Sequence, residues 1–178
     1  MELRENGWAA PITRFAKNGG AVIGICGGYQ MLGQKVLDPH GLEGDIRSID
    51  GLGLLQIETE LMPEKTVKTS FPKSNEFDCD LQGYEIHMGH TQGADCARPM
   101  VEFDTHCDGA ISETGNVRGC YLHGLFGSDV YRRKLLKQLG LKHAAMHSHA
   151  QNVEDALDEF AADLEKFVDV DGLLELAR

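Results

Sequence analysis

The sequence lacks extended clusters of basic residues and long apolar runs, and each absence excludes a class of protein. Its 178 residues carry 17 Lys and Arg against 28 Asp and Glu, which gives a net charge of −11. Binding to a phosphate backbone depends on clustered Lys and Arg, so we expect no nucleic-acid partner. No stretch approaches the length of a membrane span, and the first residues contain no apolar signal core. These features predict a cytoplasmic protein without a membrane partner.

The sequence also lacks closely spaced pairs of cysteines. The five cysteines show no Cys-x-x-Cys spacing and fit reduced thiols better than a disulfide framework; they are Cys26, Cys79, Cys96, Cys107 and Cys120. The candidate ligands for a zinc site are His87, His90, Cys96, His106 and Cys107. The His-x-x-His pair falls in an expected strand and loop rather than on a helix face, so we expect no metal.

One segment, residues 20–33, has the pattern of a nucleophile elbow. The apolar run 21–25 is typical of a strand buried on both faces of a sheet, and Cys26 follows it directly. Gly27 and Gly28 come next, before residues that can begin a helix. Cys26 therefore lies at a predicted strand-to-helix turn, where glycines on either side relieve crowding.

The elbow pattern suits a nucleophilic thiol. At a helix N-terminus the free N–H groups and the helix dipole favour the thiolate, and the Gly27 N–H points to where an oxyanion would form. The alternative is a buried, inert cysteine in a tight or phosphate-binding turn. The apolar strand before Cys26 favours the first interpretation.

A candidate base follows the predicted strand 117–122. His123 lies at the carboxyl end of this strand, at the sheet edge where Cys26 is also expected. A solvated loop histidine is the alternative, but the combination with an elbow cysteine favours catalysis.

The remaining patterns predict one α/β domain with a mixed sheet, because helical and strand periodicities share a chain too short for two comfortable domains. We expect helices over 1–18, 29–36 and 129–139, the last capped by Ser128. Antiparallel strands are expected over 65–70 and 81–88, with an edge strand at 83–91. A packing helix with an acidic outer face is expected over 153–168.

Four ordered motifs carry a family resemblance over essentially the whole chain. Residues 24–33 (GICGGYQMLG), 51–55 (GLGLL), 83–89 (GYEIHMG) and 121–126 (YLHGLF) resemble the glutaminase domain of the cobyric acid synthase family. That family contains class I glutamine amidotransferases of cobalamin biosynthesis. The resemblance implies a flavodoxin-like α/β fold with a mixed, mainly parallel sheet.

The resemblance also implies the chemistry. Cys26 is expected to attack the side-chain amide of glutamine, and His123 to pass a proton to the leaving ammonia. The residues expected to bind glutamine are Gly27, Gly28, Gln30, His87 and Gly89. Ammonia would then pass to an ATP-dependent synthetase domain, which amidates adenosylcobyrinic acid diamide.

Three departures from the family pattern stand out. Leu125 occupies the position where most class I amidotransferases carry the third triad residue, a glutamate, although the cobyric acid synthase branch shares this departure. His90 stands where arginine is usual. The first strands of the domain, with a glycine loop that supplies a second oxyanion N–H, have no counterpart here. We therefore expect residues 1–178 to be one glutaminase domain from a longer chain.

The resemblance places the cofactors and the second substrate elsewhere. We expect no cofactor in this chain, and expect ATP, magnesium and the corrinoid only on the absent synthetase domain. Glutaminase partners of cobyrinate diamide synthase or cell-wall isoglutaminyl synthase remain alternatives. So do a catalytically silent interaction module and a flavodoxin-like cysteine peptidase, although a peptidase would not need Gln30.

Overall fold

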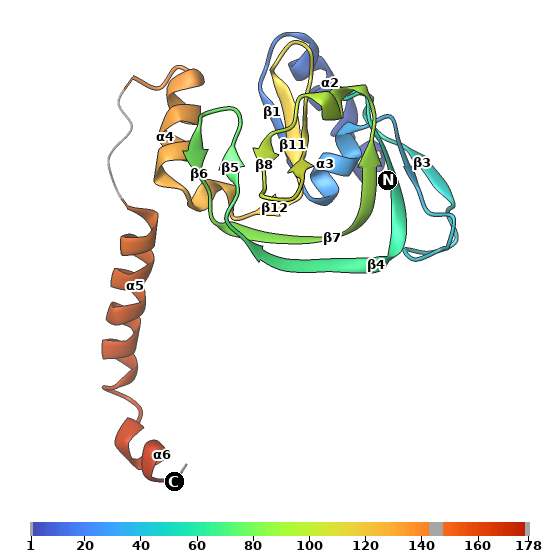
Figure 1. Cartoon of the computed structure of the whole chain (residues 1–178). Helices are drawn as coiled ribbons and strands as arrows, with labels where there is room; N and C mark the ends of the chain where they lie inside the picture. Colours follow the sequence, from blue (N-terminus) through green and yellow to red (C-terminus); the bar gives the residue numbers. More distant parts are fainter. Residues whose placement is uncertain (1, 143–147, 177–178) are drawn as a thin grey trace.

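The computed structural model describes residues 2–142 and 148–176 (Figure 1). The α-helices are α1 (Glu2–Glu5), α2 (Ala9–Lys17), α3 (Gly27–Leu32), α4 (Asp129–Gln138), α5 (His149–Leu164) and α6 (Val170–Leu176). The longer strands are β1 (Val22–Ile25), β2 (Lys35–Leu37), β3 (Ser48–Asp50), β4 (Glu58–Ser70), β7 (Gly83–Gln92) and β11 (Val117–Cys120). Two-residue strands are β5 (Lys73–Ser74), β6 (Cys79–Asp80), β8 (Val101–Glu102), β9 (Cys107–Asp108), β10 (Ala110–Ile111) and β12 (Leu122–His123). Short 3-10 turns cover Ala94–Ala97 and Leu125–Gly127.

The strands form three mixed or antiparallel sheets, in the orders β1-β11-β10, β12-β7-β4-β2-β3 and β6-β5-β8-β9. In the described residues, the parallel pairings are β1 with β11 and β2 with β4. The α/β class and the mixed pairing predicted from the sequence are confirmed. The expectation of a mainly parallel sheet is wrong, because the other strand pairings among the described residues are antiparallel. The parallel pair β1–β11 matters most for function, because it fixes where the elbow cysteine emerges.

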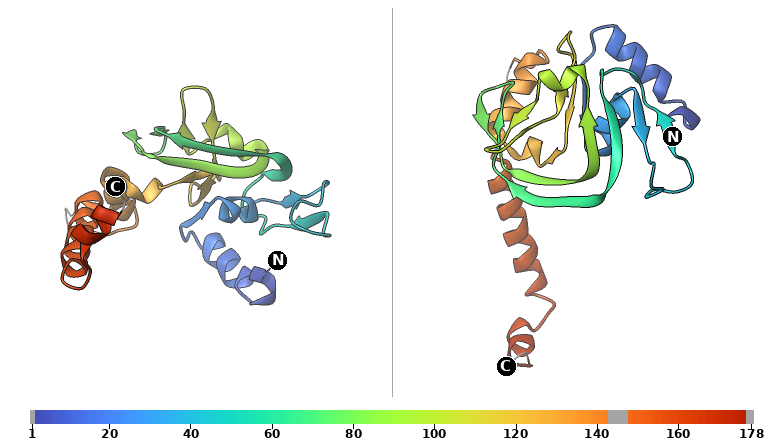
Figure 2. Two further views of the ribbon diagram at one scale, coloured as in Figure 1. Left: turned by 90° about the horizontal axis from the view of Figure 1, so that it is seen from below. Right: turned by 45° about the vertical axis from the view of Figure 1, so that its right-hand side comes forward.

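Strands β4 and β7 form a long antiparallel pair that curves around one side of the molecule (Figures 1 and 2). Buried Leu55, Ile57, Thr59 and Leu61 alternate with exposed residues, as in a strand with one face toward the core. The expectation that residues 83–91 form an edge strand is wrong. β7 lies between β12 and β4, because the short strand that ends at His123 pairs with its outer side.

The predicted strand before the elbow is present as β1, but it is less buried than expected. Val22 packs against one apolar cluster while Ile23 and Ile25 pack against the other, so both faces are covered in part. Each of these side chains remains partly exposed. In the part of the chain that the structure describes, only β11 pairs with β1, which leaves its other edge open.

The helices differ from expectation at two places. The predicted helix 1–18 is two helices, because Gly7 adopts a positive φ of 76° between α1 and α2. The helix after the elbow ends at Leu32 rather than at 36, because Gly33 is extended and leads into β2. Helix α4 begins as predicted, with the Ser128 hydroxyl accepting a hydrogen bond from the Tyr131 N–H.

Helix α5 forms where an amphipathic helix is expected, but its apolar face does not pack. No residue of α5 or α6 is buried, and both helices extend away from the rest of the molecule (Figures 1 and 2). Neither these nor the other described helices combine the length and apolar character that a membrane span requires.

Candidate active site

Cys26 occupies a strained turn between β1 and α3. Its φ of 53° and ψ of −119° lie outside the regions that non-glycine residues usually adopt, and strain of this kind clusters at functional sites. The Cys26 N–H donates to the Cys120 carbonyl at 3.0 Å, so the turn is tied to the end of β11. The predicted elbow is therefore present.

The glycines around Cys26 have different physical roles. A Cβ on Gly24 would lie 2.7 Å from the Gly28 backbone, so close packing of β1 against α3 requires glycine there. A Cβ on Gly27 or Gly28 would meet nothing within 4 Å outside its chain neighbours and the backbone of α3, so packing against the rest of the molecule does not require glycine at these two positions. Their N–H groups belong to the first turn of α3 and have no intrahelical acceptor. These groups remain available to a ligand.

Cys26 lies on the wall of a cleft of about 600 Å³. Gly27, Gln30 and His87 line the same cleft, so the structure brings four of the predicted site residues together. The Cys26 thiol contacts the Ile86 carbonyl of β7, with 3.5 Å between Sγ and the oxygen. The other lining residues are Met31, Val36, Asp38, Glu43, Ile46, Ile49, Leu61, Lys65, Ile86 and Met88.

Gln30 belongs to a line of polar contacts that ends inside the fold. Its Nε2 donates to the Tyr121 hydroxyl at 3.2 Å, and that hydroxyl lies 2.6 Å from Thr91 Oγ1. Thr91 Oγ1 is in turn 2.7 Å from Thr59 Oγ1. A Cβ on Gly89 would lie 2.7 Å from both Gln30 Nε2 and the Tyr121 hydroxyl. Gly89 thus supports the site through close packing rather than by lining the cleft.

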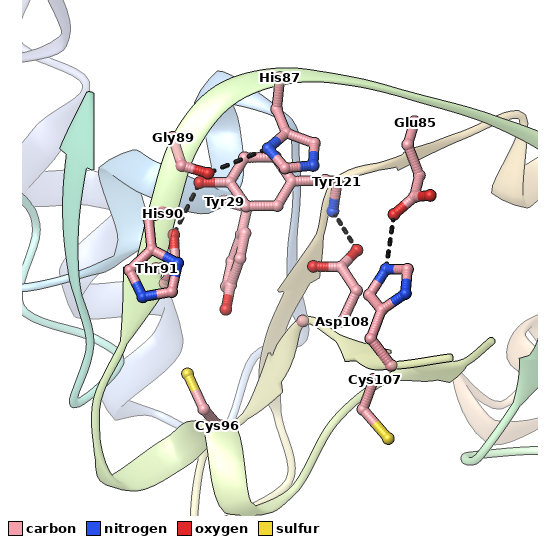
Figure 3. A pocket seen from close by; sticks show the side chains of 12 residues that line it. Tyr29, Glu85, His87, Gly89, His90, Thr91, Cys96, Cys107, Asp108 and Tyr121 are labelled. Carbon is pink, nitrogen blue, oxygen red and sulfur yellow. Dashed lines mark hydrogen bonds and ion pairs between the residues drawn. The ribbon is translucent and has the colours of Figure 1, made fainter. Parts of the chain in front are cut away.

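His87 is held by two contacts. Its Nδ1 lies 2.9 Å from the Gly89 carbonyl, and its ring stacks on Tyr121 with centroids 4.1 Å apart (Figure 3). Because a carbonyl only accepts, Nδ1 carries the hydrogen of this bond. His87 is thus held on β7 between the cleft and a second cavity.

His123 does not line the cleft, but it adjoins the same part of β7 as Cys26. It pairs with Tyr84 across the β12–β7 ladder, whereas the Cys26 thiol contacts Ile86. Two residues of a strand span about 7 Å. His123 Nδ1 donates to the Tyr121 carbonyl at 3.1 Å, and its ring stacks on Tyr84 with centroids 5.1 Å apart. These two contacts fix the orientation of the His123 ring.

Leu125, at the position of the usual triad glutamate, is a core residue. Only 1% of it is exposed, and it packs in the cluster that contains Leu81, Leu122 and Tyr131. The partners of the His123 ring are a backbone carbonyl and an aromatic ring.

A second cavity of about 300 Å³ lies behind His87 and Tyr121 (Figure 3). Two carboxylates face it, of which Glu85 is buried and Asp108 is half-buried. Glu85 is bonded to Ser70 and to His106 Nε2 at 2.9 Å, and Asp108 accepts from the Tyr121 N–H at 2.7 Å. Burial is the main cause that raises the pKa of Asp108.

The five residues of the zinc site considered in the sequence analysis all line this second cavity. They do not form a metal cluster: across residues 2–142 and 148–176, no three His, Cys, Asp or Glu side chains come together as ligands.

Sequence reasoning missed the residues that organise the site. Tyr121 contacts Gln30, His87 and Asp108, and Tyr84 stacks on His123. Both residues stand inside the quoted motifs, but their partners lie up to 91 positions away in the chain. No periodicity connects such positions.

The chain is similar to known proteins over most or all of its length. Residues 1–131 match the CobB/CobQ-like glutamine amidotransferase domain. A cobyric acid synthase of Sinorhizobium sp. is 53% identical over 178 residues, which are 100% of this chain and 36% of that protein. The cobyric acid synthase of Brucella canis is 49% identical over 99% of this chain, again 36% of the relative. The chain thus spans about a third of the length of the curated relatives it matches.

Solved structures support the fold. The chain matches PurLQS from Thermotoga maritima with a TM-score of 0.53 at 18% identity, covering 74% of this chain and 68% of that one. It matches a crystal structure of a glutamine amidotransferase with a TM-score of 0.55 at 14% identity, covering 78% and 71%. The elbow, the cleft and the family match together show that this chain belongs to the CobB/CobQ-like glutamine amidotransferase domain family.

Proposed function

We propose that this chain hydrolyses glutamine with Cys26 as the nucleophile and delivers the ammonia for the synthesis of cobyric acid. The observation that carries the proposal is the strained backbone of Cys26 on the wall of a cleft shared with Gly27, Gln30 and His87. Strain costs stability and persists only where the surrounding structure enforces it. An inert structural cysteine would not need this geometry.

In the first half of the reaction, Cys26 Sγ attacks the side-chain amide carbon of glutamine. The thiol proton moves to His123 Nε2, the ring nitrogen that is not bonded to the Tyr121 carbonyl. The Gly27 N–H, which has no intrahelical acceptor, stabilises the oxyanion. The carbon–nitrogen bond then breaks, and ammonia leaves with the proton from His123.

In the second half, water hydrolyses the thioester on Cys26. His123 takes one proton from the water, the carbon–sulfur bond breaks, and glutamate leaves as Sγ regains a proton. Each cycle converts glutamine and water into glutamate and ammonia and restores both residues.

Glutamine is held by the wall of the cleft around Cys26. Gln30 offers an amide that is held in place by Tyr121, and His87 lines the same cleft with its ring fixed against the same tyrosine. Gly28 contributes a second exposed N–H at the start of α3, and Gly89 permits the close packing behind Gln30. A polar group fixed in advance binds a substrate at lower entropic cost.

The role in a larger enzyme is supported by the relatives. Those compared, at 49% and 53% identity, are named cobyric acid synthases and are almost three times as long as this chain. We propose that ammonia passes to an ATP-dependent synthetase part, which amidates adenosylcobyrinic acid a,c-diamide. ATP and magnesium belong to that part, and the cytoplasmic location expected from the sequence is included in this proposal.

The test is labelling with a diazo-ketone analogue of glutamine, followed by peptide mapping. Burial raises the pKa of the Cys79, Cys96 and Cys120 thiols, which lowers their reactivity. Cys107 is exposed and is the internal control, because a simple alkylator such as iodoacetamide reaches it without a glutamine site. We expect the analogue to label Cys26 alone, and excess glutamine to prevent this. Labelling of Cys107 at the same rate as Cys26 would contradict the proposal.

A further inference from the structure

Helix α5 carries a regular apolar stripe. Val153, Leu157, Phe160 and Leu164 recur at spacings of four, three and four residues, which places them on one face of the helix. We call these four residues the α5 stripe. A stripe at this spacing is typical of a helix that packs against another helix or into an apolar groove.

The stripe is exposed although the helix itself is held in place. Leu157 is 55% exposed and Phe160 is 62% exposed. The start of the helix is fixed, because the Ser148 hydroxyl accepts from the Gln151 N–H and the His149 N–H donates to Asp129 of α4 at 3.1 Å. The stripe is thus presented by an anchored helix that points away from the body (Figure 1).

The charges around the stripe argue against a second copy of this chain as the occupant. Residues 149–176 carry nine acidic side chains and one lysine, Lys166, which is paired with Asp163. Two such helices side by side would place like charges along both rims of the contact, and like charges oppose association. The matching partner is an apolar surface with a basic rim.

The comparisons indicate where that partner lies. The amidotransferase domain match ends at residue 131, before α5, whereas the Sinorhizobium sp. relative matches all 178 residues. Helix α5 is therefore shared with proteins that carry much more chain, of which this match accounts for 36%. It lies outside the part that glutamine amidotransferases of the family have in common.

We propose that the α5 stripe docks the amidating part of the enzyme, through an apolar surface on that part rimmed by Lys and Arg. The inference rests on the proposed function for the identity of the partner, but not on the chemistry at Cys26. Docking through α5 would hold the glutaminase body beside the site that uses its ammonia. The acidic rim would orient the two parts and make the association sensitive to salt.

The experiment measures binding in solution. The probe is the part of the Sinorhizobium sp. cobyric acid synthase outside the match to this chain, produced as a separate polypeptide whose folded state is checked by circular dichroism. Titration calorimetry is performed with the unaltered chain and with a Leu157→Ala/Phe160→Ala variant, in which alanine preserves the helix. We expect the variant to bind about tenfold more weakly or worse, and the unaltered chain to bind more weakly as salt rises from 0.05 to 0.5 M.

A matched control comes from elsewhere on the surface. Leu139 is 54% exposed and Phe71 is 72% exposed, so a Leu139→Ala/Phe71→Ala variant removes similar groups outside α5. It should bind like the unaltered chain. Equal binding by both variants, no binding by the unaltered chain, or a dimer of this chain that the α5 substitutions dissolve in sedimentation experiments would each overturn the proposal. A Cys26→Ala chain should bind normally, so loss of glutamine hydrolysis and loss of docking are separable.

Discussion

Replacing Leu125 with glutamate would restore the side chain that most class I amidotransferases carry two residues after the histidine. We expect the Leu125→Glu variant to lose stability rather than gain a catalytic triad. Leu125 is 1% exposed and packs among Leu81, Leu122 and Tyr131, so the new carboxyl group would enter an apolar cluster. Gln is the matched control at this position, since it has nearly the same shape and no charge.

The loss in the free energy of unfolding can be worked out from the burial of Leu125. Losing the apolar contacts of a buried leucine costs roughly 2–3 kcal/mol, and an unpaired polar group in their place costs about 1–3 kcal/mol more. Both variants bear these costs. Ionisation at pH 7 adds up to about 3.7 kcal/mol for glutamate alone, from 1.36 kcal/mol per pH unit above its usual pKa of about 4.3. The total is comparable to the roughly 5–15 kcal/mol of a typical domain.

The pH dependence distinguishes the two variants. Burial raises the pKa of the carboxyl group in the folded state, so the ionisation cost is absent below about pH 4.3 and grows as the pH rises toward the folded-state pKa. Urea unfolding followed by far-ultraviolet circular dichroism should therefore show similar midpoints for Glu and Gln near pH 4. At pH 7 the Glu variant should have a much lower midpoint. Trp8 is exposed, which makes its fluorescence a poor reporter.

A different outcome would refute this reasoning. If the Leu125→Glu variant were as stable as the unaltered chain at pH 7 and released glutamate faster, then position 125 could reach His123. The Tyr121 carbonyl would no longer suffice as the partner of that ring.

Three further predictions concern the histidines and the open edge of β1. At saturating glutamine, His123→Ala should lower glutamate release from a complete enzyme by about a hundredfold or more, and His87→Ala should lower it by less. The reverse order would assign the role of the base to His87. Tyr84→Ala should lower kcat by roughly three- to tenfold with little change in KM, because it removes the ring stacked on His123. Tyr84→Phe keeps a ring at this position and should restore kcat. A change in KM alone would contradict a positioning role. An N-terminal extension that adds strands beside β1 and a second oxyanion N–H should raise glutamate release, since one such donor is typically worth about 3 kcal/mol. Equal turnover with and without the extension would show that residues 1–178 already hold a complete glutaminase.

The sequence by itself determined the local elements of the site. An apolar run, a cysteine and two glycines define β1, the elbow and α3, because a buried strand, a tight turn and a helix start each depend on residues within a few positions. Ser128 likewise predicted the start of α4, since a cap acts across three residues. The place of His123 at the end of a predicted strand made it a candidate base, and the family motifs added the residues expected to bind glutamine, again as short local patterns.

Only the tertiary structure decided what these elements meet. Tyr121 joins Gln30, Thr91 and Asp108, which are separated from it by up to 91 positions, and no local pattern encodes such contacts. The apolar face of α5 predicted that this helix packs against the rest of the domain. No residue of α5 is buried, because packing also depends on how the rest of the chain is arranged around the helix.

Position 125 shows the same division. The sequence shows that position 125 is a leucine and not a glutamate, but it does not show what takes over the role of the carboxylate. The structure gives the reason: β12 ends at His123, Gly124 follows, and the 3-10 turn that begins at Leu125 places the Leu125 side chain in the core. His123 is left to a backbone carbonyl and the ring of Tyr84, contacts that exist only once β12 has paired with β7.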